Sequence, residues 1–247
     1  MSEGGSGFSA FLRELVIVVV GALIASTLLR VFLLQVFLIP SRSMETTLEV
    51  GDRVAVIKVV KPDRGDIVVF ADNLEWLGNP DRVQHTWWES SLMFMGLLPD
   101  SATNHLIKRV IGTEGDHVVC CDAAGRISVN GVALDETSYL YTSPEGEQNR
   151  PSQYPFDVVV PAGRIFVMGD HRSNSADSRC HLSEESLGVE ALGGFPSADS
   201  VVGVTKATIF PFDRWRAYSA PPAFDAIPDP AEPAPAEPVV AGDLPYC

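Results

Sequence analysis

Two serines directly follow the most hydrophobic part of the chain, in the segment IPSRSMETTLEVGDRV, which begins at Ile39. A serine hydroxyl attacks a carbonyl carbon only when a neighbouring base takes its proton, and that base is usually a histidine or a neutral lysine. Ser41 and Ser43, separated by a single arginine, are therefore candidate nucleophiles. The chemistry then depends on which base the rest of the chain provides.

One short segment holds a histidine beside an aspartate and two serines: Asp170, His171, Ser173 and Ser175. The members of a Ser-His-Asp triad are brought together by the fold from separate parts of a chain, not by a few consecutive residues. The G-x-S-x-G pattern, which presents a nucleophilic serine on a sharp strand-to-helix turn, is also absent from the sequence. These observations disfavour a histidine-based triad.

Lysine is the other candidate base, and the chain has only four: Lys58, Lys61, Lys108 and Lys206. A lysine amine is neutral near pH 7 only where burial disfavours its charged form, so the base should lie among apolar neighbours. In NHLIKRVIGTEGD, strand alternation places Leu106, Lys108 and Val110 on one face. Lys58 and Lys206 also lie in apolar strand-like segments, and a lysine at an exposed strand edge is the alternative reading. The pattern alone leaves the choice of lysine open.

A dense polar segment, VMGDHRSNSADSR, runs from Val167 to Arg179. Segments this polar are often solvated turns. A loop that directly follows a strand can instead supply the hydrogen bonds that hold a catalytic group in place. The segment is therefore a candidate second part of the site.

The serines are preceded by a long apolar segment that carries no charge from Leu15 to Leu29 and ends in VFLLQVFLIP. A membrane-spanning helix needs about 20 mostly apolar residues, so we predict a short cytoplasmic N-terminus at 1–12 and a transmembrane helix at 13–34. A cleaved signal peptide is the alternative, but the apolar segment is long for one and no A-x-A-like site follows. Arg13 gives a slight preference for the N-terminus inside. The VFLLQVFLIP segment could be a strand at the membrane surface.

From Asp52 onward the chain consists of short β-branched runs separated by turn signals such as Glu114-Gly115-Asp116. Around Asn130-Gly131 the pattern predicts a hairpin. Many short strands with Gly and Asp turns indicate a mostly β fold, with a β-rich domain of antiparallel sheets over 35–217. The predicted strands lie at 53–60, 66–70, 106–112, 117–120, 126–131, 157–163, 164–170 and 201–210.

Two segments depart from this β pattern. Residues 74–100 are rich in Trp, Leu and Met and are predicted to be an insertion, either a satellite of the core or a segment at the membrane surface. Residues 218–247 are rich in Pro, Ala and acidic residues and are predicted to form a disordered tail.

The charge and the cysteines limit the partners. A net charge of −14 offers no basic patch, which argues against nucleic acid. The cysteines show no C-x-x-C spacing, so neither a zinc site nor a redox motif is expected, and no metal or cofactor is predicted. If the domain lies outside the cytoplasm, Cys180 could pair with Cys120 or Cys121; the alternative is that all of them are free.

Four segments, in the right order, resemble the motifs of the bacterial type I signal peptidases, which are membrane-bound endopeptidases with a Ser-Lys dyad. The family's nucleophile motif, roughly P-S-x-S-M-x-P-T-L, is similar to PSRSMETTL at 40–48. The RGDIVVF strand stands unchanged at 64–70, and the likeness runs from the membrane segment to about Trp215. The lysine and final motifs resemble IKRVIGTEGD at 107–116 and GDHRSNSADSR at 169–179. The insertion and the single membrane helix look most like members from high-GC Gram-positive bacteria.

The resemblance implies that Ser43 is the nucleophile and Lys108 the general base. It implies an oxyanion hole made of the Ser41 hydroxyl and the Ser43 backbone N–H. It also implies that Ser175 hydrogen-bonds the Lys108 amine and orients it.

Supporting roles and departures also follow from the resemblance. Asp170 would pair with Arg109 under the site, while Asp177 and Arg179 would brace the loop. Three positions differ from the family pattern without removing a group that the mechanism needs: Arg42 stands for a common glycine, Thr46 for proline and His171 for asparagine.

The implied function is removal of N-terminal signal peptides from exported preproteins with A-x-A-type cleavage sites. The implied location is the plasma membrane, with the catalytic domain on its extracytoplasmic side, next to phospholipid and in contact with the secretion translocon. The self-cleaving SOS repressors share the dyad, but they are soluble and carry a DNA-binding head. A membrane-anchored adaptor on a degenerate peptidase domain is a further alternative, and it would lack Ser43, Lys108 or Ser175, all of which are present.

Overall fold

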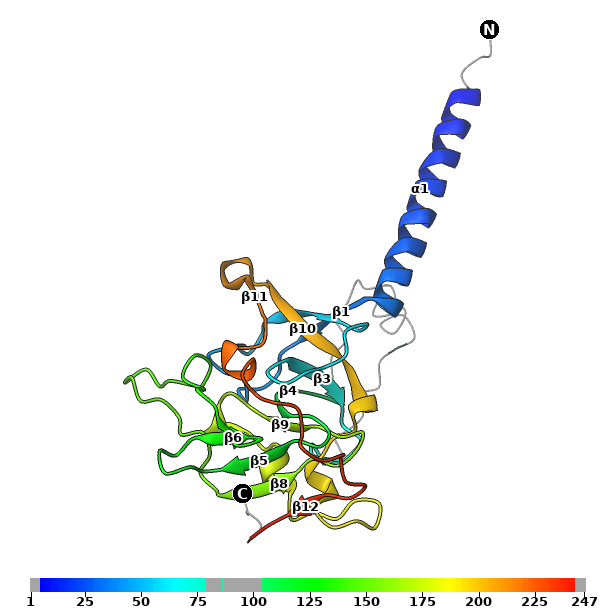
Figure 1. Cartoon of the computed structure of the whole chain (residues 1–247). Helices are drawn as coiled ribbons and strands as arrows, with labels where there is room; N and C mark the ends of the chain where they lie inside the picture. Colours follow the sequence, from blue (N-terminus) through cyan, green and yellow to red (C-terminus); the bar gives the residue numbers. More distant parts are fainter. Residues whose placement is uncertain (1–4, 79–85, 87–103, 243–247) are drawn as a thin grey trace.

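The computed structural model describes residues 5–78, 86 and 104–242. Most of the predicted insertion, residues 79–85 and 87–100, therefore lies outside the described residues. The described part is one long helix followed by a body that contains two antiparallel sheets (Figure 1). This confirms the predicted mostly β fold behind an N-terminal helix.

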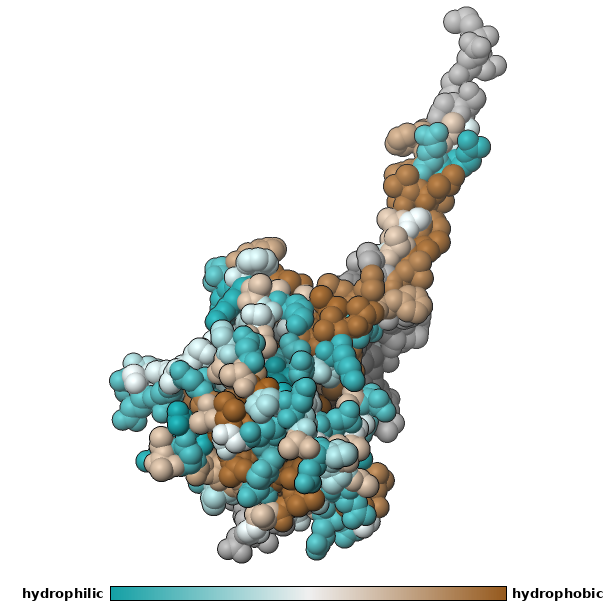
Figure 2. All heavy atoms as spheres, in the orientation of Figure 1, coloured by the Kyte–Doolittle hydropathy of each residue, from teal (hydrophilic) through white to brown (hydrophobic). Residues whose placement is uncertain are grey.

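Helix α1 (Gly5–Phe32) projects from one end of the body (Figure 1). Its segment Phe8–Leu28 is long and apolar enough to cross a membrane, and none of it is buried against the rest of the protein. Figure 2 shows the apolar band along the helix and a further apolar area where the helix meets the body. The helix ends at Phe32 rather than at residue 34, because the chain from Leu34 onward pairs as a strand.

The first sheet carries the segments that resemble catalytic motifs. Its strand order is β1-β2-β10-β3-β4-β9, and β11 pairs with β10. Every neighbouring pair is antiparallel. The strands are β1 (Leu34–Leu38), β2 (Arg53–Ile57), β3 (Ile67–Ala71), β4 (His105–Gly112), β9 (Phe166–Met168), β10 (Val201–Phe210) and β11 (Arg216–Ala217).

The second sheet has the order β12-β8-β5-β6-β7 and is also antiparallel. The turn between β6 and β7 is the predicted Asn130-Gly131 hairpin, and both turn residues have positive φ, as such a turn requires. The strands are β5 (His117–Cys120), β6 (Ile127–Val129), β7 (Val132–Ala133), β8 (Phe156–Val159) and β12 (Val239–Val240).

Short 3-10 helices occupy several of the connections between strands. Two of them, η1 and η2, belong to the polar segment that follows β9. Their bounds are η1 (Arg172–Asn174), η2 (Ser178–His181), η3 (Leu192–Gly194), η4 (Ala198–Ser200), η5 (Phe212–Arg214) and η6 (Pro222–Phe224).

The tail does not form the predicted disordered segment over its described part, 218–242. Phe224 and Ile227 are buried in the apolar cluster of the second sheet, and β12 pairs with β8 (Figure 1). Between them, the Ala162 backbone N–H donates to the Pro235 carbonyl at 2.8 Å. Proline-rich chain favours an extended backbone, and an extended backbone can lie along an open strand edge such as that of β8. Buried apolar side chains, backbone hydrogen bonds and strand pairing together hold the described part of the tail against the body.

The cysteine pairing also differs from the prediction. Cys120 and Cys121 form a disulfide with each other, so neither of them is the partner of Cys180. No cysteine in the described part of the chain is free. The reading in which all the cysteines are free is therefore wrong as well.

The packing of Phe224 can be tested by its removal. The side chain is 5% exposed and lies against Gly65, where an added Cβ would come within 2.8 Å of the ring. We expect Phe224→Ala to lower the free energy of unfolding by about 3 kcal/mol, because it leaves a cavity in a closed site. The measurement is urea denaturation of the detergent-solubilised protein. The matched control is Phe212→Ala, whose ring is 81% exposed and whose loss should leave the midpoint unchanged. Equal midpoints for both variants would show that the tail does not pack here.

Candidate active site

Lys108 lies near the middle of β4, which is hydrogen-bonded to β3 on one side and to β9 on the other. Because both neighbours and both faces of the strand are covered, only 2% of Lys108 is exposed. Its Nζ donates to the Ser43 Oγ at 2.7 Å and to the Ile107 carbonyl at 3.1 Å. The structure therefore joins one of the candidate serines directly to one of the candidate lysines.

The surroundings of Lys108 favour its neutral form. Burial lowers the pKa of Lys108 from 10.5 to about 8, although the negative charges of Asp177 and Asp170 act in the opposite direction. Desolvation disfavours an ammonium ion because the protein cannot replace its hydration. An amine with this pKa is partly neutral at physiological pH and can accept a proton from a hydroxyl in contact with it.

Ser43 is held in a packed turn between β1 and β2. The next residue, Met44, and Leu48 are fully buried in the apolar cluster of this end of the body. The Leu48 backbone N–H donates to the Met44 carbonyl at 2.7 Å, which closes the turn. The Ser43 carbonyl accepts from the His171 backbone N–H at 3.0 Å. Ser43 is thus held in place by the buried turn that follows it and by the hydrogen bond from His171.

Ser41 lies next to this turn and remains exposed. Its Oγ is 3.3 Å from the Ser43 Oγ, and either hydroxyl could be the donor. In the described part of the chain no backbone acceptor takes the Ser43 N–H. A hydroxyl and a free N–H therefore stand beside the candidate nucleophile, as an oxyanion hole requires.

Ser175 does not make the predicted hydrogen bond to Lys108. Its Oγ is buried and has no hydrogen-bond partner in the structure. It is packed against Gly169, where an added Cβ would lie 2.3 Å from the Ser175 Oγ and 2.4 Å from the Ser43 carbonyl. The Lys108 amine donates to Ser43 and Ile107 instead. The hydroxyl of Ser175 is therefore buried without a hydrogen bond.

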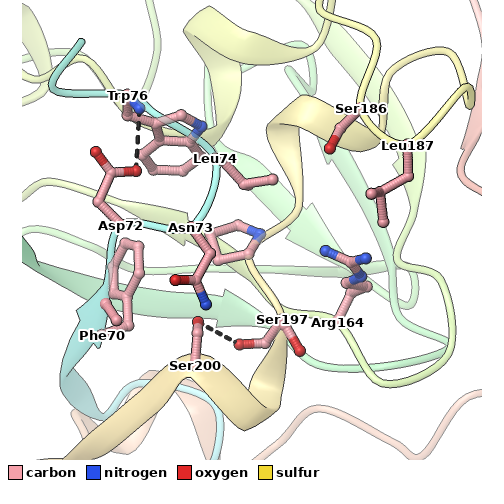
Figure 3. Close-up of a pocket in the computed structure, with 12 residues that line it drawn as sticks. Phe70, Asp72, Asn73, Leu74, Trp76, Arg164, Ser186, Leu187, Ser197 and Ser200 are labelled. Carbon is pink, nitrogen blue, oxygen red and sulfur yellow. Dashed lines mark hydrogen bonds between the residues drawn. The ribbon is translucent and has the colours of Figure 1, made fainter. Parts of the chain in front are cut away.

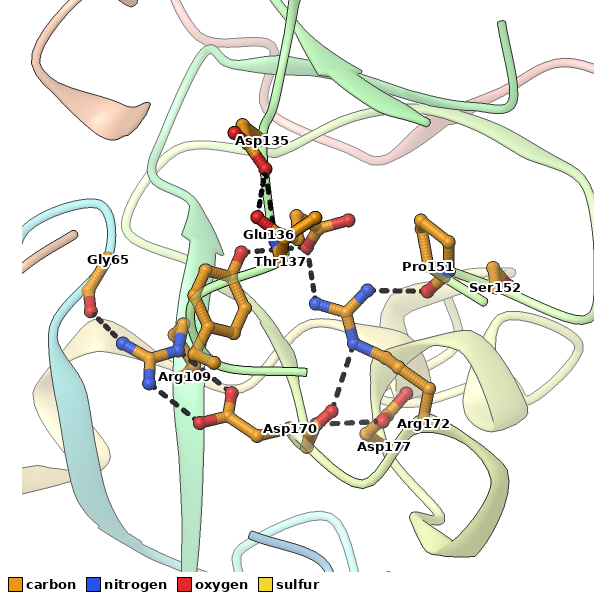
Figure 4. Close-up of polar contacts among 12 residues, drawn as sticks. Gly65, Arg109, Asp135, Glu136, Thr137, Pro151, Ser152, Asp170, Arg172 and Asp177 are labelled. Carbon is orange, nitrogen blue, oxygen red and sulfur yellow. Dashed lines mark hydrogen bonds and ion pairs between the residues drawn. The ribbon is translucent and has the colours of Figure 1, made fainter. Parts of the chain in front are cut away.

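Arg109 and Asp170 form the predicted ion pair beneath the site (Figure 4). The Arg109 Nε and its terminal nitrogen donate to the two carboxylate oxygens at 2.8 and 2.6 Å, while its other terminal nitrogen donates to the Gly65 carbonyl at 2.7 Å. Thr47 Oγ1 also donates to the Asp170 carboxylate at 2.6 Å. The pair therefore links β4, the Gly65 turn and the segment after Ser43.

Asp177 and Arg179 also pair, and they hold the polar segment in shape. The Arg179 Nε donates to Asp177 at 2.8 Å, and Asp177 accepts from the Gly169 backbone N–H at 3.0 Å. Burial acts to raise the pKa of the Asp177 carboxyl, but the charge of Arg179 and these hydrogen bonds leave the pKa below its usual value. Asp177 thus stays ionised in the interior, close enough to Lys108 to influence its charge.

The other candidate bases are not in contact with Ser43. Lys206 pairs with Asp66 at 3.1 Å, and Lys58 follows the end of β2 without reaching Ser43. His171 Nδ1 lies 2.9 Å from the Glu45 carboxylate, and Ser173 bonds Asn149. No histidine-based triad forms in the segment that suggested one.

A separate cavity of about 240 Å³ lies at the end of β3 (Figure 3). Apolar side chains such as Phe70 and Trp76 line it, together with the charged side chains of Asp72 and Arg164. None of the residues predicted for the site lines it. The hollow is therefore separate from the contact between Ser43 and Lys108.

Comparisons with known proteins give one family. The family model described as "Signal peptidase, peptidase S26" matches residues 12–210. Signal peptidase I of Mycobacterium tuberculosis (strain CDC 1551 / Oshkosh) is 35% identical over 224 residues, which cover 83% of this chain and 74% of that protein. Probable signal peptidase I of Mycobacterium leprae (strain TN) is 33% identical and covers 74% of this chain and 71% of its own. Probable signal peptidase I-1 of Synechocystis sp. (strain ATCC 27184 / PCC 6803 / Kazusa) is 32% identical, with 83% and 86% covered.

Proposed function

Since the chain belongs to the peptidase S26 family, the signal peptidases, which are serine endopeptidases that remove signal peptides, we propose that Ser43 is its nucleophile and Lys108 its general base. The observation that carries this proposal is the 2.7 Å contact between the Lys108 Nζ and the Ser43 Oγ. The burial that lowers the lysine pKa to about 8 supports it. The adaptor alternative is not favoured, because the relatives are named as peptidases and this chain keeps both reacting side chains.

In the first step, neutral Lys108 takes the proton of Ser43 while the Ser43 Oγ attacks the carbonyl carbon before the cut. The developing oxyanion receives hydrogen bonds from the Ser41 hydroxyl and the Ser43 backbone N–H. Loss of one such donor typically costs about 10²–10³ in rate. Lys108 then gives its proton to the leaving amine, and the acyl-enzyme forms.

In the second step, Lys108 takes a proton from water while the water oxygen attacks the ester carbonyl; the bond to the Ser43 Oγ then breaks, Lys108 returns the proton to that oxygen, and the signal peptide is released. The charged amine that exists between these proton transfers has three N–H donors, one more than the neutral form. The buried hydroxyl of Ser175 has no partner in the structure. We assign it as the acceptor for the additional N–H, which is the orienting role expected from the sequence. Arg109, Asp170, Asp177 and Arg179 support the site without reacting.

The substrates are exported preproteins, and small residues of the A-x-A type before the cut are the proposed specificity. The apolar helix and the relatives make the chain a membrane-anchored enzyme. We place the body on the extracytoplasmic side, where signal peptides are released.

Protease added to spheroplasts should then degrade the body, and complete protection would contradict this orientation.

The hairpin between β10 and β11 is the proposed contact with phospholipid. Phe212 and Trp215 are 81% and 64% exposed there. The hairpin and α1 project from the same end of the body (Figure 1). Exposed aromatic rings of this kind are favoured at the level of lipid headgroups.

The dyad is tested by cleavage of a secretory preprotein in detergent and phospholipid, with mass spectrometry of the products. We expect wild type to make a single cut after an A-x-A-like site. Ser43→Ala and Lys108→Ala should each abolish the cut, because one removes the nucleophile and the other the base. Unchanged circular dichroism would show that both variants are folded. An active Lys108→Ala protein would contradict the assignment of the base.

The pH dependence follows from the lowered pKa of Lys108. Only the neutral amine can take the serine proton, so kcat/KM should fall about tenfold per pH unit below the pKa of about 8 and level off above it. The measurement is kcat/KM for a peptide substrate between about pH 6 and pH 9, with folding checked at each pH. A flat profile over this range would mean that another group is the base or that chemistry is not rate-limiting.

Lipid contact is tested by fluorescence in vesicles of brominated phospholipid, which quenches tryptophans that reach the membrane. We expect the Trp215→Phe protein to lose part of the quenched signal, because its exposed indole is the one in contact with lipid. Trp76→Phe is the matched control, since that indole donates to the Gly193 carbonyl at 2.8 Å inside the body. Equal quenching in wild type and Trp215→Phe would exclude this contact surface.

A further inference from the structure

The segment that carries Ser43 is joined to His171 twice. The His171 backbone N–H donates to the Ser43 carbonyl at 3.0 Å, and its Nδ1 lies 2.9 Å from the Glu45 carboxylate. An ionised carboxylate can only accept a hydrogen bond, so the Nδ1 must carry the hydrogen and donate it to Glu45. One residue of the polar segment thus holds both the backbone and a side chain of the nucleophile turn.

The side-chain contact is protected from water. The side chains of His171 and Glu45 are 11% and 16% exposed. The imidazole is stacked on Tyr141, with ring centroids 3.8 Å apart and planes within 10° of parallel. The other oxygen of Glu45 faces Arg42 at 3.5 Å, but the Arg42 side chain is 70% exposed, and ion pairs in that setting contribute little. The contact with His171 is therefore the one that can fix Glu45.

The residue between the two anchored side chains has an unusual backbone. Thr46 has φ of +79°, a left-handed conformation that a β-branched residue adopts only when its surroundings hold it there. Glu45 before it contacts His171, and Thr47 after it donates to Asp170 at 2.6 Å. Two consecutive residues of the polar segment therefore hold the two neighbours of Thr46 and keep the turn in this shape.

We propose that Glu45 and His171 are positioning residues, whose side-chain contact keeps the turn in the conformation that holds the Ser43 Oγ against Lys108. The proposal rests on the assignment of Ser43 and Lys108 as the dyad. Neither Glu45 nor His171 touches the reacting atoms. Their contact determines how often the Ser43 hydroxyl and the Lys108 amine are within hydrogen-bond distance. Small misplacements of reacting groups reduce rates strongly.

The test is the kinetics of a peptide substrate with the full-length protein in detergent. We expect Glu45→Ala and His171→Ala each to lower kcat about tenfold and to leave KM within about twofold. The double variant should lose no more than either single variant, because both remove the same contact. His117→Ala is the matched control: its ring bonds Asp157 at 2.6 Å, within the second sheet, and its loss should leave kcat unchanged.

A rescue experiment separates positioning from general structural damage. The side-chain amide nitrogen of asparagine lies about where the imidazole Nδ1 does, so His171→Asn can still donate to Glu45. The amide of glutamine extends one methylene further and cannot replace Nδ1 in place. We expect His171→Asn to keep most of the wild-type kcat and His171→Gln to resemble His171→Ala.

The backbone of Thr46 offers a second variant. Glycine adopts a positive φ without strain, so Thr46→Gly should keep the observed turn and a kcat close to that of wild type.

The proposal is overturned if Glu45→Ala and His171→Ala cleave as fast as wild type, if their losses multiply in the double variant, or if His171→Asn is as impaired as His171→Ala. These outcomes differ from a failure of the dyad itself. In that case Ser43→Ala or Lys108→Ala would remain active, whatever the Glu45 and His171 variants do.

Discussion

The removal of water from around one amine sets the requirements for the rest of this structure. Lys108 can act as a base near neutral pH only if its charged form is made unfavourable, and burial on β4 does this. Burial on a strand needs neighbours on both edges and cover on both faces. β3 and β9 supply the edges, while the turn after β1 and the polar segment after β9 close over the side chain. The same enclosure brings the hydroxyl of Ser43 to the amine, so a group that helps to exclude water from Lys108 is also the group that its amine contacts.

An apolar enclosure alone would be simpler, yet the site is surrounded by buried charges. They are arranged as close pairs, Arg109 with Asp170 and Asp177 with Arg179, so that each carboxylate near the lysine has a cation of its own. A buried carboxylate without a partner would hold a proton on Lys108 and raise its pKa, which is the effect that Asp177 and Asp170 exert in part. Pairing limits this effect. It also lets rigid, hydrogen-bonded side chains join segments that are far apart in the chain, as Thr47 and Asp170 do.

The sequence predicted the local features of this arrangement better than the long-range ones. Strands such as β4 and the Asn130-Gly131 hairpin follow from alternation and turn chemistry, which act over a few residues. Alternation could not separate Lys108 from Lys206, because the difference is made by Asp66, which pairs with Lys206 from the turn before β3. The tail was expected to be disordered because composition does not show that Phe224 has a buried place. Ser175 was expected to bond Lys108, but the hydroxyl is packed against Gly169 instead, and only the fold shows that fit.

The tail shows how such long-range contacts reach the chemistry. Phe224 packs against the turn at Gly65, and the Gly65 carbonyl accepts from Arg109. Closer to Ser43, the Tyr218 hydroxyl donates to the Thr47 carbonyl at 2.9 Å. Arg109 and Thr47 both bind Asp170, so these two contacts converge on one carboxylate beneath Ser43 and Lys108. A segment with no reacting group of its own therefore helps to hold the base of the site, because the positions of the reacting atoms depend on every element that the buried aspartate connects.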